Sequence, residues 1–186
     1  MAYKYFDINN QELFNPDLQN KNKWCKAGEK IEESFIRLYG KELGLIINPQ
    51  KATNPYAPDL LNIINNKLGD LKFQSTPFFK AKSLYNTDPT YAVVFNLKDQ
   101  LRYVNNYPDV EIYYWVNWIA LKFQMWNTEI IVNPLFGVWT VEFPIFNKYL
   151  ASRPLHDYQQ RVNDNKGNAK SSYVCDIRDE IFNKLI

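Results

Sequence analysis

The chain has 186 residues, which is enough for one α/β domain with a substantial hydrophobic core. Its apolar content of 46% and its aromatic content of 16% exclude a disordered or collagen-like chain. The formal net charge is only +2, so a nucleic-acid site would have to be a local basic patch.

Two features of the sequence predict where the protein acts. No apolar run reaches the ~18 residues of a membrane-spanning helix, and the first ten residues contain no apolar segment of a secretion signal. Cys25 and Cys175 lie far apart in the sequence, which favours free thiols in a reducing compartment over a metal site. We therefore expect a cytoplasmic protein with no membrane partner.

The first half of the chain predicts a helix followed by three strands. Residues 1–26 mix polar and aromatic residues without a clear period, which predicts an irregular N-terminal segment. Apolar residues then recur at helical spacing until Gly40 and Gly44, which are typical of a helix end. The expected elements are a helix over residues 29–41 and strands over residues 45–47, 59–64 and 67–75.

The second half alternates strands and helices. The expected strands cover residues 91–95, 110–118, 130–132 and 138–143, and the expected helices cover residues 97–106, 146–150 and 177–185. A polar, glycine-containing loop is expected over residues 163–172. Because the sequence contains no internal repeat and no clear linker, we expect a single domain over residues 1–186.

Two acidic residues and a lysine stand at a spacing that suggests chemistry. Asp59 follows a proline, and Asp70-Leu71-Lys72 comes after ten intervening residues. Asn65-Asn66 is typical of a two-residue hairpin turn, which would place Asp59 opposite Lys72 on the neighbouring strand.

Side chains alternate between the two sides of each strand, so this register puts Asp59, Asp70 and Lys72 on one face. Gln74 would join them as a supporting residue. A slip of one residue would separate Asp59 from the other two.

Two carboxylates and an ammonium group on one face have a clear chemical use. Asp59 and Asp70 can hold a hard divalent cation together with water and a phosphate oxygen. Lys72 can position or deprotonate the attacking water, or stabilise the charged transition state. The alternative is purely structural, with Asp59 as a turn residue and Asp70 and Lys72 on a solvated strand face.

Pro58-Asp59 and Asp70-Leu71-Lys72 lie among helix, strand, strand, strand, helix and strand segments. Over about residues 28–118, this pattern resembles the PD-(D/E)xK nuclease superfamily, which includes restriction endonucleases, Holliday-junction resolvases and phage exonucleases. The resemblance implies an α/β restriction-endonuclease-like core, with a mixed central β-sheet flanked by α-helices. It also implies Mg²⁺ as cofactor, with Mn²⁺ as substitute, Asp59 and Asp70 as metal ligands, and Lys72 as catalytic base or stabiliser.

The superfamily often carries a glutamate on its first helix, and the Gly28-x-x-x-Glu32 segment looks like that element. The apolar residues of this helix define one buried arc at about 100° per residue. Glu32 lies at the edge of the arc, where it could support catalysis, whereas Glu33 points away from it. We therefore expect Glu32 at the site and Glu33 in solvent.

The features that could contact a substrate are less specific. Lys80 and Lys82 could contact DNA phosphates, or could belong to a solvated loop. Tyr113, Trp115 and Trp118 could stack on bases, but their strand spacing favours the core or an interface.

These observations predict a Mg²⁺-dependent DNA endonuclease of the Type II restriction-like or phage type. Cutting both strands needs two sites, which favours a homodimer. Residues 119–186 would supply DNA contacts or the dimer interface. Two alternatives remain open: a junction-resolvase-like nuclease of recombination or repair, and a catalytically inactive DNA-binding or assembly module on the same fold.

Overall fold

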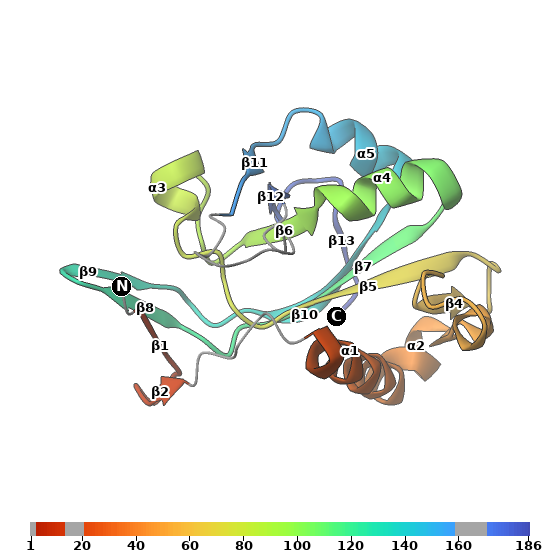
Figure 1. The fold of residues 1–186 in the computed structure, drawn as a ribbon, viewed down its shortest axis with the longest axis horizontal. Coiled ribbons are helices and arrows are strands. Elements are labelled where there is room, and N and C mark those ends of the chain that lie inside the picture. Colours follow the sequence, from red (N-terminus) through yellow and green to blue (C-terminus); the bar gives the residue numbers. More distant parts are fainter. Residues whose placement is uncertain (1–2, 14–20, 159–170) are drawn as a thin grey trace.

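A mixed six-stranded sheet lies between helices in the computed structural model, which describes residues 3–13, 21–158 and 171–186 (Figure 1). Its strand order is β13-β10-β7-β5-β4-β3. The strands are β3 (Leu45–Ile47), β4 (Leu60–Asn62), β5 (Leu68–Gln74), β7 (Glu111–Asn117), β10 (Phe136–Glu142) and β13 (Asn183–Lys184). The predicted α/β class with a mixed sheet and flanking helices is confirmed.

Helices cover the two faces of this sheet separately. α1 (Lys21–Phe35) packs against one face, and α4 (Leu97–Asn106) and α5 (Phe143–Leu150) cover the other (Figure 1). Val110, Ile112, Tyr114, Val116 and Trp118 are buried together on the α4 side, as their alternation predicts. Tyr113 and Trp115 are buried on the α1 side. The prediction that Tyr113, Trp115 and Trp118 belong to the hydrophobic core is therefore confirmed.

The first helix begins earlier than predicted. Residues 1–26 were expected to be irregular, but they contain β1 (Lys4–Phe6), β2 (Glu12–Leu13) and the start of α1. The helix continues through a π-helical turn (Ile36–Gly40) and α2 (Lys41–Leu43) to Gly44, whose φ of 66° makes it the expected left-handed cap. Gly40 lies inside the helical segment, where a Cβ would come within 2.8 Å of the Leu45 carbonyl oxygen.

The predicted two-residue turn at Asn65-Asn66 is wrong. A longer loop joins β4 to β5, in which the Asn62 side chain accepts from Ile64 N–H at 2.9 Å and Asn62 N–H donates to Lys67 O at 2.9 Å. Leu60 therefore pairs with Gly69, a shift of two residues from the predicted register. Because the shift is even, the paired residues of β4 and β5 keep their predicted faces, whereas Asp59 precedes β4 and lies outside the ladder.

β5 and β7 run parallel, so the chain between them must cross over one face of the sheet. The crossover contains α3 (Ala81–Tyr85), β6 (Ala92–Asn96) and α4, and α4 has the predicted bounds. β6 belongs to a second sheet of order β11-β12-β6, with β11 (Leu155–His156) and β12 (Ser172–Asp176).

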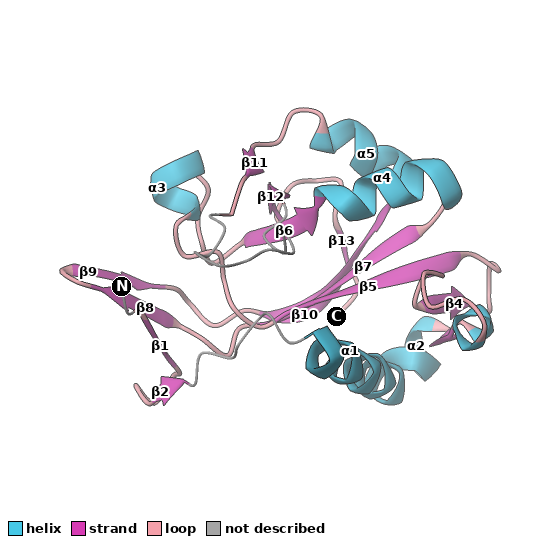
Figure 2. Ribbon diagram, viewed as in Figure 1, coloured by secondary structure: helices cyan, strands magenta, loops and turns pink. Residues whose placement is uncertain are grey.

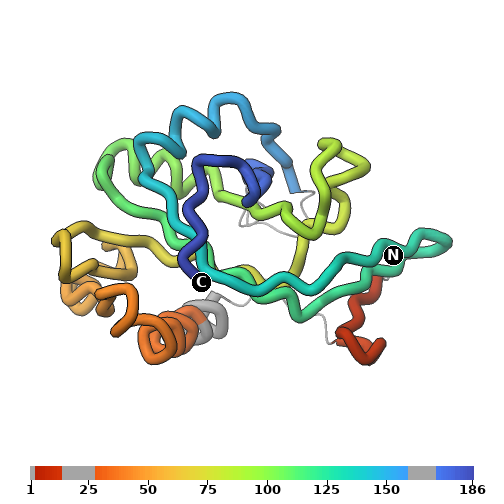
Figure 3. The backbone as a smooth tube through the Cα atoms, turned by 180° about the vertical axis from the view of Figure 1, so that it is seen from behind, coloured from red at the N-terminus to blue at the C-terminus, as the bar shows by residue number. Residues whose placement is uncertain are grey.

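A third sheet, of order β2-β1-β8-β9, extends from one end of the central sheet (Figures 1 and 3). Its hairpin consists of β8 (Lys122–Met125) and β9 (Thr128–Ile131). The sequence predicted only part of β9 and none of the other three strands.

The predicted C-terminal helix over residues 177–185 is wrong. Turns replace it, with Asp179 N–H donating to Asp176 O at 3.1 Å and Phe182 N–H donating to Asp179 O at 3.0 Å. β13 then pairs with β10 at the edge of the central sheet (Figure 2). Apolar residues at positions 177, 181 and 185 imitate helical spacing, although strand pairing and burial of Phe182 decide the structure. Residues 163–170 of the predicted loop lie outside the described residues, and Ser172 begins β12.

Among the described residues, no helix combines the length and the apolar character needed to cross a membrane.

Candidate functional site

Asp59 and Asp70 lie where β4 and β5 separate. The last paired residues of the ladder are Leu60 and Gly69, so Asp59 and Asp70 come next on their two segments. One Asp59 carboxylate oxygen accepts from the Leu71 N–H at 3.1 Å. This oxygen takes the position that a main-chain carbonyl oxygen of a neighbouring strand would occupy. The site therefore lies at a local opening of the sheet.

A first group of charges, the edge cluster, contains Glu32, Lys51 and Asp59. Lys51 Nζ lies 2.5 Å from a Glu32 oxygen and 2.6 Å from an Asp59 oxygen. Glu32 comes from α1 and Lys51 from the short 3-10 helix Pro49–Ala52. Glu32 is half-buried and pairs with Lys51, whereas Glu33 is exposed as expected; a catalytic role for Glu32 stays a prediction. Lys51 was missed by the sequence analysis.

A buried asparagine explains why Lys51 and Asp59 meet. The Asn48 side chain donates to Pro58 O at 2.9 Å and accepts from Gln50 N–H at 3.1 Å. Its backbone N–H donates to Asp59 O at 2.9 Å. Asn48 thus fixes the start of the 3-10 helix against the Pro58-Asp59 segment.

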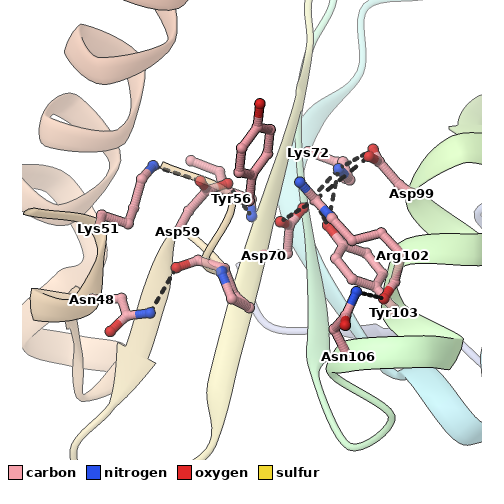
Figure 4. Close-up of polar contacts among 12 residues, drawn as sticks. Asn48, Lys51, Tyr56, Asp59, Asp70, Lys72, Asp99, Arg102, Tyr103 and Asn106 are labelled. Atoms are coloured by element: carbon pink, nitrogen blue, oxygen red, sulfur yellow. Dashed lines mark hydrogen bonds and ion pairs between the residues drawn. The ribbon is translucent and has the colours of Figure 1, made fainter. Parts of the chain in front are cut away.

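A second group, the buried cluster, contains Asp70, Lys72, Asp99 and Arg102 (Figure 4). Lys72 Nζ lies 2.7 Å from an Asp70 oxygen and 2.6 Å from an Asp99 oxygen. Arg102 lies 3.3 Å from Asp70 and 3.5 Å from Asp99. Only 3% of the Asp70 side chain is exposed. Asp99 and Arg102 come from α4, and only their i,i+3 spacing on that helix could have suggested them.

Tyr103 contacts both cations of the buried cluster through its hydroxyl. Its ring is fully buried, and its hydroxyl accepts from Arg102 at 2.5 Å. Lys72 Nζ lies 3.4 Å from the same hydroxyl. The cations therefore have a fixed position, set by a packed aromatic residue.

Burial and neighbouring charges both shift the pKa values of Asp70 and Lys72. Burial raises the pKa of Asp70, and Asp59 adds to this effect against the attraction of Lys72. Burial would lower the pKa of Lys72, but Asp70 and Asp99 outweigh it, so this pKa is raised. Lys72 therefore stays an ammonium ion at neutral pH.

Glu32 carries a different perturbation. Burial first, and then the charge of Asp59, raise its pKa to about 7, against the opposing effect of Lys51. A carboxyl group with this pKa exchanges its proton near neutral pH. A cation bound in the edge cluster would therefore favour loss of the Glu32 proton.

Three other predicted residues lie elsewhere. The Gln74 amide donates to Val94 O at 2.7 Å and accepts from Val94 N–H at 3.2 Å, so it joins β5 to β6. Lys80 and Lys82 are exposed at α3, which follows the opposite end of β5 from Asp70 (Figure 1). The structure does not bring these three residues to the two carboxylates.

The donor set of the two clusters fits a hard cation that keeps some of its water. No group of three or more His, Cys, Asp or Glu residues that could hold a metal occurs in the described part of the chain. Mg²⁺ needs only one or two carboxylates when water and phosphate complete its shell. One buried Asp70 oxygen forms no aligned hydrogen bond, although Lys72 lies near it. Asp59 and Asp70 could therefore hold such an ion.

An open cleft of about 610 Å³ adjoins the buried cluster. Asp99 and Arg102 belong both to the buried cluster and to the wall of the cleft. The remaining lining residues are Asn54, Tyr56, Lys98, Asn106 and Tyr107.

No protein-family model matches the chain, and neither a curated protein nor a solved structure matches it.

Proposed function

We propose that this protein is a Mg²⁺-dependent nuclease that hydrolyses phosphodiester bonds in DNA. The observation that carries the proposal is the position of Asp59 opposite Asp70, with Lys72 2.7 Å from Asp70. Two carboxylates beside a cation are the groups that metal-assisted attack of water on a phosphate requires.

The topology supports the same conclusion. α1, β3, β4, β5, α4 and β7 follow the helix, strand, strand, strand, helix and strand order of the PD-(D/E)xK resemblance. β3, β4 and β5 pair antiparallel, and β5 pairs parallel with β7. A restriction-endonuclease-like core is therefore part of the proposal.

Each residue of the site has a defined task in this mechanism. Asp59 and Asp70 would hold the Mg²⁺, which supplies Lewis-acid stabilisation of the phosphate and a more acidic water. The water oxygen would attack phosphorus, and the bond from phosphorus to the leaving sugar oxygen would break. The attacking water would lose a proton to solvent, and the leaving sugar oxygen would take up a proton from solvent. Lys72 and Arg102 stabilise the negative charge that develops on the phosphate oxygens.

The protonation state of Lys72 decides between its predicted roles. A general base must be neutral before it accepts a proton, but Asp70 and Asp99 favour the charged form and raise the Lys72 pKa. We therefore assign Lys72 to charge stabilisation. Asp99, 2.6 Å away, is a positioning residue for Lys72.

One observation favours a second candidate function, an inactive DNA-binding or assembly module. Lys51 Nζ lies between Glu32 and Asp59, within 2.6 Å of both carboxylates. A lysine there supplies positive charge in a place that a divalent cation could take. If Lys51 replaces the cation permanently, the fold remains and catalysis is lost.

Incubation of the pure protein with plasmid and phage DNA, in Mg²⁺ and in EDTA, tests the proposal. We expect cleavage in Mg²⁺ and Mn²⁺, none in EDTA, and binding with little cleavage in Ca²⁺. Equal cleavage in EDTA, or none under any condition, would contradict it. If duplex DNA is cut on both strands, we expect a homodimer, because each chain supplies one site.

A further inference from the structure

We propose that the cleft beside the buried cluster binds one unpaired nucleotide of the substrate next to the scissile phosphate. The inference rests on the proposed function for the nature of the ligand. The cleft volume of about 610 Å³ lies within the roughly 300–1,000 Å³ of small-ligand sites. Besides the Asp99 carboxylate, its lining combines aromatic rings, amides and cations, which are the groups that single-stranded nucleic acids contact.

Tyr56 presents its ring from a stiff turn. The residue is 68% exposed and stands between Pro55 and Ala57-Pro58. The Asn54 side chain accepts from Tyr56 N–H at 3.0 Å, and Ala57 N–H donates to Asn54 O at 3.0 Å. Proline and these hydrogen bonds limit the freedom of the backbone that carries the ring before a ligand arrives. An exposed tyrosine in a fixed turn is suited to stack on a base.

The opposite wall is one face of α4. Lys98, Arg102 and Asn106 follow one another at a spacing of four residues, so they form one row along the helix. Lys98 is exposed, and the Arg102 guanidinium also lies at 3.3 Å from Asp70. This row offers positive charge for the backbone and an amide for a base edge.

Arg102 makes the cleft continuous with the proposed catalytic site. Because it lines the cleft and contacts Asp70, a phosphate bound to Arg102 would lie between the cleft and the carboxylates. Tyr56 lines the same cleft as Arg102. The attached base would then reach the Tyr56 ring only if it were not stacked in a duplex. The geometry thus favours a single strand, a flap or a frayed end as substrate.

Binding in EDTA tests this inference without catalysis. Fluorescence anisotropy would compare a labelled oligothymidylate of about twelve nucleotides with a duplex of the same length. We expect tighter binding of the single strand by the wild-type protein. Tyr56→Ala should raise its Kd about tenfold or more, because stacking of one base is lost, whereas Tyr56→Phe should keep it. Lys98→Ala should reduce the slope of log K against log salt by about 0.7.

The matched control is Trp126→Ala, which removes a 75% exposed aromatic ring from the turn between β8 and β9. It should bind the single strand like the wild type. Unchanged binding by Tyr56→Ala, or an equal loss in Trp126→Ala, would overturn the inference. Mg²⁺-dependent cleavage of duplex DNA by Tyr56→Ala at the wild-type rate would overturn the inference and leave the proposed function intact. Tyr56-dependent binding without any cleavage would support the inference and contradict the proposed function.

Discussion

The edge cluster and the buried cluster use the same residue types but differ in charge balance. In the buried cluster two carboxylates face two cations, and the Tyr103 hydroxyl contacts both cations. In the edge cluster two carboxylates share Lys51 alone. The buried cluster is therefore neutral when its groups are ionised, whereas the edge cluster keeps one negative charge. The comparison favours the Asp59 side as the place for an added cation, and under the proposed function it leaves Lys72 to stabilise charge on the phosphate.

The largest expected effect tests the buried cluster. Lys72→Ala should lower Mg²⁺-dependent cleavage by about 10²–10³-fold, because a fixed charge next to the reacting phosphate is lost. Asp70→Asn should lower the rate at least as much and should also weaken metal binding, which Lys72→Ala should largely spare. Single-turnover cleavage rates would measure both variants, with circular dichroism to verify folding. Lys67→Ala is the matched control, since Lys67 pairs with Glu142 outside both clusters; wild-type rates in Lys72→Ala would contradict the assignment.

The second prediction tests the edge cluster with two neighbouring glutamates. Glu32→Gln should lower the cleavage rate by at least roughly tenfold, equivalent to about 1.4 kcal/mol, because it removes a carboxylate next to Asp59. Glu33→Gln should leave the rate unchanged, since Glu33 is exposed. Equal behaviour of the two variants, measured under identical conditions, would show that the edge cluster has no part in the reaction.

The third prediction follows from the Glu32 pKa of about 7. Glu32 must lose its proton before it can help to hold a cation, so Mn²⁺ affinity should rise about tenfold between pH 6 and pH 8. In the metal-free protein the same raised pKa has the opposite consequence for folding. Between the ordinary glutamate value and pH 7 the native state binds more protons than the unfolded chain, so the free energy of unfolding should fall as pH rises.

Glu32→Gln is the control for this pH dependence. Calorimetric titrations with Mn²⁺ at several pH values, and urea unfolding over the same range, would follow both effects. If Glu32→Gln keeps the wild-type pH dependence of metal affinity, another group is responsible.

The smallest expected effect concerns Lys51. Lys51→Ala removes a positive charge from the edge cluster, so Mn²⁺ affinity should rise several-fold, because Lys51 no longer repels the divalent ion. In EDTA the same variant should lose about 1–3 kcal/mol of unfolding free energy, because Glu32 and Asp59 remain without their shared partner. Lys41→Ala, on α2, should change neither quantity. A loss of metal affinity in Lys51→Ala would contradict the proposed charge balance.

The sequence predicted the part of the site that depends on strand alternation. Asp70 and Lys72 share a face because they are two residues apart on β5. Asp59 comes just before β4, and its carboxylate contacts Lys51 and the Leu71 N–H instead of Lys72. The helix over residues 97–106 was also correct, but the contact of Asp99 with Lys72 depends on how α4 crosses the sheet. Helical periodicity also distinguished the half-buried Glu32 from the exposed Glu33.

Long-range contacts explain what the sequence could not predict. Lys51 reaches the site only because the buried Asn48 fixes the 3-10 helix to the Pro58-Asp59 segment. The C-terminal residues pair with β10 despite their helical spacing. Tertiary pairing overrides local pattern in both places.

The central claim is that Asp59 and Asp70, one from each cluster, hold one divalent cation together. Calorimetric titration of Mn²⁺ into the wild-type protein, Asp59→Asn, Asp70→Asn and Asp109→Asn tests it most directly, because Asp109 is an exposed aspartate outside both clusters. We predict one site in the wild type and in Asp109→Asn, and a loss of at least about tenfold in affinity in each of the other two variants. Equal Mn²⁺ binding by all four folded proteins, or no binding by the wild type, would contradict the claim.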